Sequence, residues 1–333
     1  MLPRALFNEV TVEKIATLKD TQIIQPVQVS PSDQRNELVF FIKPELLIVE
    51  DQEKILNSLQ LIRQKFEEFN VAVHGAALVT GSFLKENEIM NRHYGFINQL
   101  SRKASEMIDP EARKLIFDNL GQEDQGNHRI LGGHEFLATF NTDVDTLSDV
   151  WFGKGARKLR SGFYFIEETF NDIPILLVNG FHPSQLEHFT HEDHRILLML
   201  LHTDTDWFEM KFDLVGDTFP ERAKPGSIRG MLAADPDKYG LTEVGINTNG
   251  VHLSAGPFEA AFEVVNFFGA LLNLDPTLNP PLAIKRAMEA GFSIEDALRL
   301  LTNPALNESD LFTATENLNT DEGIELIKSD FTH

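Results

Sequence analysis

One short segment near the N-terminus restricts the fold more than any other: a continuous apolar run, Leu38–Ile42 (LVFFI), which is followed by Pro44. An unbroken run of this kind is typical of a strand buried on both faces. A second apolar run, Val71–Val79, ends before Gly81. Between the runs, apolar residues recur at three- or four-residue spacing, which predicts an amphipathic helix, at Ile55, Leu59, Ile62, Phe66 and Phe69. The order strand, helix, strand predicts a sheet with a helix packed against it.

The second half of the chain offers another strand and another helix. Arg195–His202 is apolar: its length favours a strand, whereas Thr190 with Asp193 resembles a helix-capping box, and we expect the strand. Pro257 stands where a helix can begin without losing a hydrogen bond. The residues that follow predict an amphipathic helix, with Phe258, Ala261, Val265, Phe268 and Leu272 on its apolar face. We therefore expect an α+β fold with helices packed on a sheet.

Composition limits the classes of partner. The chain has 333 residues, of which 42% are hydrophobic, and a formal net charge of −22. A protein with this much negative charge has no general attraction for nucleic acid or for an anionic membrane. A small anion must therefore be held by a local group of Lys, Arg and backbone N–H groups. Because there is no cysteine, disulfides and thiolate metal sites are excluded. The N-terminus lacks an apolar signal-peptide core, and we expect a cytoplasmic protein.

A histidine near the second helix is the first candidate for chemistry. His252 lies in Asn249–Ser254 (NGVHLS), just before the helix that Pro257 opens. A helix N-terminus offers N–H donors and the positive end of a dipole, which suits a phosphoryl group. Glu263, two turns into the helix, can hold one imidazole nitrogen and leave the other as the nucleophile. The alternative is a histidine that only satisfies a turn.

Further motifs give this histidine a context. Along the chain these are Phe41–Glu45 (FIKPE), the pair His93-Tyr94, Gly216–Pro220 (GDTFP), Lys224–Gly230 (KPGSIRG) and Asn249–Ser254. In order, they resemble the signature of the nucleoside diphosphate kinase family, which reads I-K-P-D, H-Y, G-x-T-N-P, P-G-[TS]-I-R-G and N-x-x-H-G-S-D. The family also carries a glutamate eleven residues after its histidine, the spacing of Glu263 from His252.

The resemblance implies a ferredoxin-like antiparallel sheet with helices packed on it. It predicts an N-terminal extension at 1–36 and a catalytic domain formed by 37–100 and 191–272. Residues 101–190 form an insertion, and 273–333 a C-terminal helical and acidic tail. Family members assemble as hexamers or tetramers, so a homo-oligomer is one expectation, although the insertion can block those surfaces. The role of the insertion and the oligomeric state stay open.

The resemblance also implies roles for individual residues. His252 is the nucleophile, oriented by Glu263 and Ser254. Lys43 and Arg229 neutralise phosphate charge. The nucleotide is contacted further by Tyr94 near the transferred group, by Thr218 near the β-phosphate and by Asn249 at the ribose and phosphate. Three of these residues also have purely structural interpretations: Lys43 as a strand-end lysine, Tyr94 as a core aromatic, and Thr218 as a helix cap.

Several positions depart from the family pattern. Leu253 stands where the family has glycine, and Ala255 where it has aspartate. Phe212 occupies the place of a phosphate-binding arginine, and the side chain of its neighbour Lys211 is expected to point elsewhere. The cationic group Lys154, Arg157, Lys158 and Arg160 of the insertion is a candidate replacement. Whether Leu253, Ala255 and Phe212 abolish activity is not decided by the sequence.

No metal is expected to be held by the protein alone. His188, His191 and His194 are spaced by three residues, but the first and last lie too far apart around a helix to meet one ion. A solvated polar stretch is the expectation there. Mg²⁺ is instead expected to arrive bound to the nucleotide phosphates.

Three functions are compatible with these residues. The first is a kinase that transfers the γ-phosphate of a nucleoside triphosphate such as ATP to a nucleoside diphosphate through phosphohistidine, or to a different acceptor. The second is a catalytically weak or inactive nucleotide-binding module on the same fold. The third is a scaffold whose insertion binds a protein. The phosphate acceptor and the base preference are not fixed by the sequence.

Overall fold

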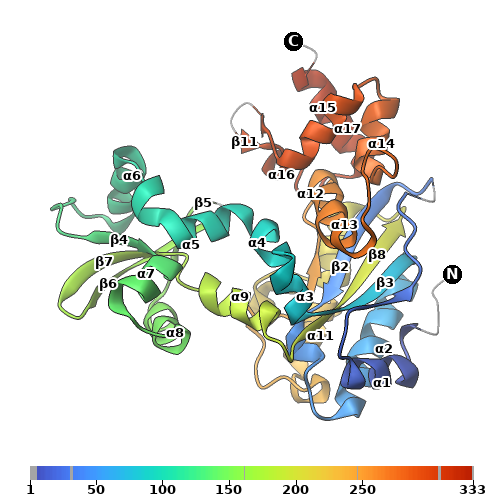
Figure 1. Ribbon diagram of the computed structural model, residues 1–333, viewed down its shortest axis with the longest axis horizontal. Helices are drawn as coiled ribbons and strands as arrows, with labels where there is room; N and C mark the ends of the chain where they lie inside the picture. The colour runs from blue at the N-terminus through green and yellow to red at the C-terminus, as the bar shows by residue number, and fades with distance from the viewer. Residues whose placement is uncertain (1–5, 31–32, 161, 246, 307–308, 332–333) are drawn as a thin grey trace. The chain divides into compact units, whose positions relative to one another are not determined.

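The computed structural model describes residues 6–30, 33–160, 162–245, 247–306 and 309–331. The chain divides into two compact units (Figure 1): residues 1–89 and 191–333 form the first, and Met90–Thr190 forms the second. The predicted insertion, 101–190, lies within the second unit. No helix in the described part of the chain is both long and apolar enough to cross a membrane.

The first unit is built on a five-stranded antiparallel sheet. Its strand order is β1-β3-β8-β2-β9. The strands are β1 (Gln22–Gln25), β2 (Asn36–Ile42), β3 (Ala72–Thr80), β8 (Arg195–Thr203) and β9 (Val251–Leu253). Without the added edge strand β1, the order β3-β8-β2-β9 is that of a ferredoxin-like fold. The predicted fold class is therefore confirmed, and Arg195–His202 is a strand, as expected.

Helices cover both faces of this sheet. The helices of the first unit before β8 are α1 (Glu9–Thr17), α2 (Gln52–Glu68) and α3 (Gly81–Glu86), while α4 (Ile89–His93) lies at the boundary of the units. Between β8 and residue 273 the helices are α10 (Trp207–Glu209), α11 (Ile228–Ala234), α12 (Pro257–Glu263) and α13 (Gly269–Leu272). Helix α2 begins at the N-cap Asp51, whose side chain accepts from the backbone N–H of Glu53.

The alternation of side chains along β2 separates the two faces. Phe40 and Ile42 point into the main core with Phe66 of α2 and Leu232 of α11. Phe41 points to the opposite face, where its ring contacts Phe267, which follows α12. The crossover helices α2 and α11 thus share one face, and the segment after β9 covers the other.

The C-terminal part of the first unit forms a small helical core of its own. Its elements are α14 (Leu282–Glu289), α15 (Ile294–Arg299), β10 (Ala305–Leu306), β11 (Ser309–Asp310), α16 (Leu311–Ala314) and α17 (Thr320–Phe331). Ile284, Leu311 and Ile327 are buried together with Phe258 of α12. This segment is therefore packed against the helix that follows the candidate nucleophile.

The second unit contains a four-stranded mixed sheet with helices on both faces (Figure 1). Its strands, in the order β4-β7-β6-β5, are β4 (Arg129–Gly132), β5 (Arg157–Arg160), β6 (Phe163–Phe170) and β7 (Ile173–Val178). The helices are α5 (Gly95–Met107), α6 (Pro110–Leu120), α7 (Gly133–Phe140), α8 (Val144–Phe152) and α9 (His182–Thr190). Strands β6 and β7 form a hairpin whose turn residues, Asn171 and Asp172, have positive φ.

Candidate active site

His252 is held on the sheet face opposite the main core. It lies in the middle of β9, opposite Phe41 of β2, and the two rings stack with centroids 4.4 Å apart. Its neighbour Leu253 lies opposite Phe40 and packs against the main core. Because adjacent side chains of a strand point to opposite faces, the leucine found in place of the family glycine lies away from the His252 ring.

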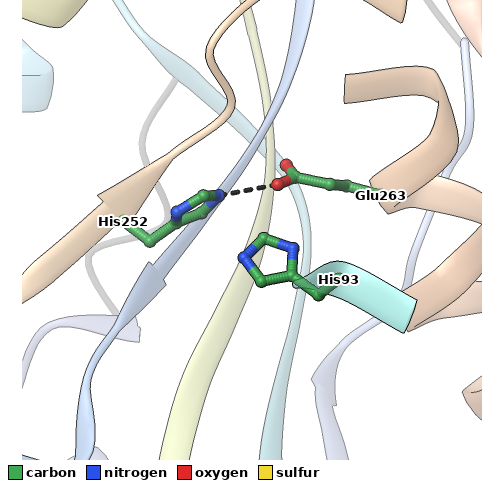
Figure 2. A group of neighbouring side chains, drawn as sticks. All are labelled: His93, His252 and Glu263. Atoms are coloured by element: carbon green, nitrogen blue, oxygen red, sulfur yellow. Dashed lines mark hydrogen bonds and ion pairs between the residues drawn. The ribbon is translucent and has the colours of Figure 1, made fainter. Parts of the chain in front are cut away.

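A buried carboxylate fixes the orientation of the imidazole (Figure 2). Glu263, at the end of α12, places Oε1 2.8 Å from His252 Nε2. Its other oxygen accepts a hydrogen bond of 2.5 Å from the Ser254 hydroxyl, which itself accepts from the backbone N–H of Val39 at 2.9 Å. With Glu263 ionised, Nε2 carries the proton and Nδ1 carries the lone pair. The contacts predicted among His252, Glu263 and Ser254 are present.

Cations surround the same histidine. The pKa of His252 is well below its usual 6.5 because of burial, and then because of the positive charges of Lys43, Arg229 and Lys211. One-fifth of the His252 side chain is nevertheless exposed. A neutral imidazole is the nucleophilic form, and these charges preserve it.

Lys43 and Asn249 are positioned as a pair. Lys43 Nζ donates to Asn249 Oδ1 at 2.7 Å, and both side chains are buried. Burial, with a smaller effect from Arg229, lowers the pKa of Lys43 to about 8, although Glu45 opposes this shift. Glu45 accepts from the backbone N–H of Gly250 at 2.9 Å. It thereby fixes the turn that leads into β9.

Arg229 retains hydrogen-bonding capacity inside the protein. Its Nη1 and Nη2 donate to the carbonyl oxygens of Gly216 and Val251, each at 2.9 Å. No acceptor in the described part of the chain bonds its buried Nε. Burial lowers the pKa of Arg229 to about 10, so it stays charged at neutral pH. An unsatisfied buried donor is costly unless a ligand supplies the acceptor.

The remaining predicted residues are placed less closely. Thr218 is exposed, and its carbonyl oxygen accepts from Asn249 Nδ2 at 3.4 Å. Tyr94 belongs to the second unit, where its ring contacts those of His182 and Phe189. A nucleotide contact by either residue stays a prediction.

The cationic residues proposed as substitutes in the insertion have partners within the second unit. Lys154 pairs with Glu168, and Arg157 donates to the carbonyl of Asn119. Lys158 lies over the ring of Tyr164, and Arg160 over that of Phe96. A contribution of these residues to nucleotide binding also stays a prediction.

Two residues of the candidate site, Phe41 and Lys211, could not be predicted from the sequence. The sequence identifies Phe41 only as a core residue, because its stacking on His252 requires β2 and β9 to pair. Lys211 is expected to point elsewhere, yet its charge acts on His252. Lys211 lies in a π-helical segment, Met210–Val215, in which side chains point in other directions than in an α-helix. Phe212, in the same segment, packs its ring against Phe208.

The comparisons with known proteins are sparse. No protein-family model and no curated protein matches the sequence. Among solved structures, an NDP kinase from Pyrobaculum aerophilum is similar to this chain, at 16% sequence identity and a TM-score of 0.35. The match covers 70% of this chain and 96% of that one. The fold class given above rests on the strand order and pairing of the sheet.

Proposed function

We propose that this chain is a nucleoside-diphosphate-kinase-like phosphotransferase, with His252 as the residue that carries the phosphate. One observation carries the proposal: an imidazole among cations whose Nε2 bonds to a buried carboxylate, which assigns the role of nucleophile to Nδ1. Phosphoryl transfer needs a positioned nucleophile and charge stabilisation more than any other covalent chemistry.

The transfer proceeds in two balanced steps. The Nδ1 lone pair of His252 forms a bond to the γ-phosphorus as the bond from that phosphorus to the leaving diphosphate oxygen breaks. Glu263 accepts the Nε2–H hydrogen bond throughout and stabilises the positive charge that develops on the ring. In the second step, a terminal oxygen of a nucleoside diphosphate attacks the phosphorus, the N–P bond breaks and the neutral imidazole returns.

Lys43 and Arg229 bind the phosphate oxygens in this proposal. The unsatisfied Nε of Arg229 fits an anionic oxygen, and the ammonium of Lys43 adds a compact positive charge. Mg²⁺ would enter on the phosphates and neutralise part of their charge. The side chains of Glu45 and Glu259 accept hydrogen bonds from the backbone N–H groups of Gly250 and Ala255. Both therefore have a structural role in holding the backbone on either side of His252.

The proposal is tested by steady-state transfer from ATP to a second nucleoside diphosphate with Mg²⁺. We expect parallel lines in double-reciprocal plots, because a phosphoenzyme separates the two half-reactions. His252→Ala should lower kcat by at least about 10³-fold, whereas His74→Ala, a half-buried histidine elsewhere in the first unit, should leave it within about twofold. Equal rates for wild type and His252→Ala would contradict the proposal. Nucleotide binding without transfer would favour a binding module.

A further inference from the structure

The loop Thr315–Asn319, which joins α16 to α17, brings the C-terminal segment to the candidate site. The backbone N–H of Asn317 donates to the carbonyl of Ala255 at 2.8 Å. At Gly256, a Cβ would lie 2.5 Å from the carbonyl oxygen of Thr315, so the two backbones approach as closely as a glycine allows. The loop is therefore seated on the turn between His252 and α12.

The loop is also anchored from its other end. Asn319 is buried, and its side-chain oxygen accepts from Asn36 Nδ2 at 2.8 Å and from the backbone N–H of Trp207 at 2.9 Å. Its Nδ2 donates to Asp206 Oδ2 at 2.8 Å. These bonds tie the loop to the start of β2 and to α10, so its position belongs to the folded first unit.

This seated loop brings a carboxylate to the third cation of the site. Glu316 Oε1 lies 2.5 Å from Lys211 Nζ. The Lys211 side chain is 22% exposed and that of Glu316 46%. Lys43 and Arg229, by contrast, are buried and bonded to Asn249 and to backbone carbonyls. Lys211 thus differs from these two cations, because its partner is an acidic side chain that is partly exposed to solvent.

We propose that Lys211 binds the phosphate chain of the reactant at His252, and that Glu316 competes with this phosphate for the Lys211 ammonium. The inference rests on the proposed function for the identity of the reactant. Its geometric basis is the Lys211–Glu316 ion pair on a loop that is bonded directly to residue 255. The positive charge of Lys211 also contributes to the lowered pKa of His252, in agreement with this placement.

The competition predicts the direction in which each substitution changes phosphate affinity. A half-exposed ion pair is weak, because water solvates both partners. A polyphosphate carries more negative charge than a carboxylate and accepts stronger hydrogen bonds. Phosphate therefore displaces the Glu316 carboxylate from Lys211, but it must break the ion pair to do so. Removing that charge should tighten binding, and removing the ammonium should weaken it.

The test is a double-mutant cycle on the full chain, read by calorimetric titration with inorganic triphosphate. Lys211→Met should weaken binding about tenfold, as expected for a lost charge-assisted hydrogen bond. Glu316→Gln should tighten it about threefold, in keeping with the small free energy of an exposed pair. The double variant should bind like Lys211→Met alone, because Glu316 acts through Lys211. Glu289→Gln, which breaks the exposed pair with Arg286 on α14, is the matched control.

Two results would overturn the inference. One is an affinity of Lys211→Met or Glu316→Gln that equals that of the Glu289→Gln control. The other is Glu316→Gln tightening binding as strongly in the Lys211→Met background as in the wild type. The proposed function is judged separately, by phosphate on His252. If the triphosphate affinities shift as predicted but His252 gains no phosphate, the Lys211–Glu316 competition stands and the kinase function is refuted.

Discussion

At the residue scale, the candidate site combines a neutral nucleophile with charged neighbours. Burial disfavours the charged form of both His252 and Lys43. The outcomes differ because the ordinary pKa values differ. His252 stays neutral at pH 7, whereas Lys43, with a pKa of about 8, stays mostly protonated. The same environment therefore supplies both a nucleophile and a cation near neutral pH.

The lowered pKa of Lys43 predicts that anion binding at the site depends on pH. Its pKa of about 8 lies below the ordinary 10.5, so its positive charge is lost as the pH rises through 8. Triphosphate binding should therefore weaken between pH 7 and pH 9. Because the bound anion favours the protonated lysine, binding at pH 9 should take up a proton. Calorimetric titrations in buffers of different ionisation enthalpy measure both effects.

The control for this prediction is Lys43→Arg, since an arginine keeps its charge throughout this range. Its affinity should change less between pH 7 and pH 9 than that of the wild type. An identical decline in both proteins would show that Lys43 is not the group responsible.

At the element scale, short and irregular segments position the site. β9 contains only Val251–Leu253, and its direction depends on Gly250, which has φ of 80°. The segment Val264–Phe268, directly after Glu263, is π-helical. Such segments occur frequently at functional sites. They aim individual side chains in directions that regular helix or strand periodicity does not predict.

Gly250→Ala should destabilise the first unit by about 1–3 kcal/mol, the usual cost of a strained backbone. Alanine disfavours positive φ, and its Cβ would lie 2.5 Å from Leu232 Cδ1. Gly226→Ala is the control, because a Cβ there meets no atom within 4 Å, and it should change stability by less than about 0.5 kcal/mol. Urea unfolding measures the difference, and equal stabilities of the two variants would refute this account of the turn.

Regular elements are also where prediction from the sequence succeeds. The apolar run at β2, the helical spacing in α2 and the start of α12 at Pro257 can be predicted from the sequence, because each depends on residues that are close together in the chain. The motifs likewise indicate Lys43, Arg229, Asn249 and His252 as candidates. The stacking of Phe41 and the pairing of Lys211 with Glu316 are not readable. They depend on strand pairing and on contacts between residues distant in the sequence.

At the scale of the whole molecule, the first unit is assembled from distant parts of the chain. The second unit enters between β3 and β8, so the central pairs β2–β8 and β3–β8 join segments separated by more than a hundred residues. The C-terminal helices complete the unit through Phe258 and Asn319. Residues after 273 are thus part of the folded unit that holds the candidate site.

Asn319→Ala tests this integration. The substitution leaves Asn36, Trp207 and Asp206 without a shared buried partner, and should cost about 2–4 kcal/mol of stability. Asn57→Ala removes an exposed hydrogen bond to the Lys238 carbonyl and should cost less than about 1 kcal/mol. Chemical denaturation followed by tryptophan fluorescence compares them. A cost for Asn319→Ala no greater than that for Asn57→Ala would mean that the C-terminal segment is not bound in this way.

Phosphorylation of His252 is measured most directly by the intact mass of the protein after incubation with ATP and Mg²⁺. We expect one added phosphate, which is lost in acid, is absent from His252→Ala and is discharged by nucleoside diphosphates. Fragmentation should place it on His252. A protein that gains no phosphate, or one whose phosphate persists in His252→Ala, would contradict the account.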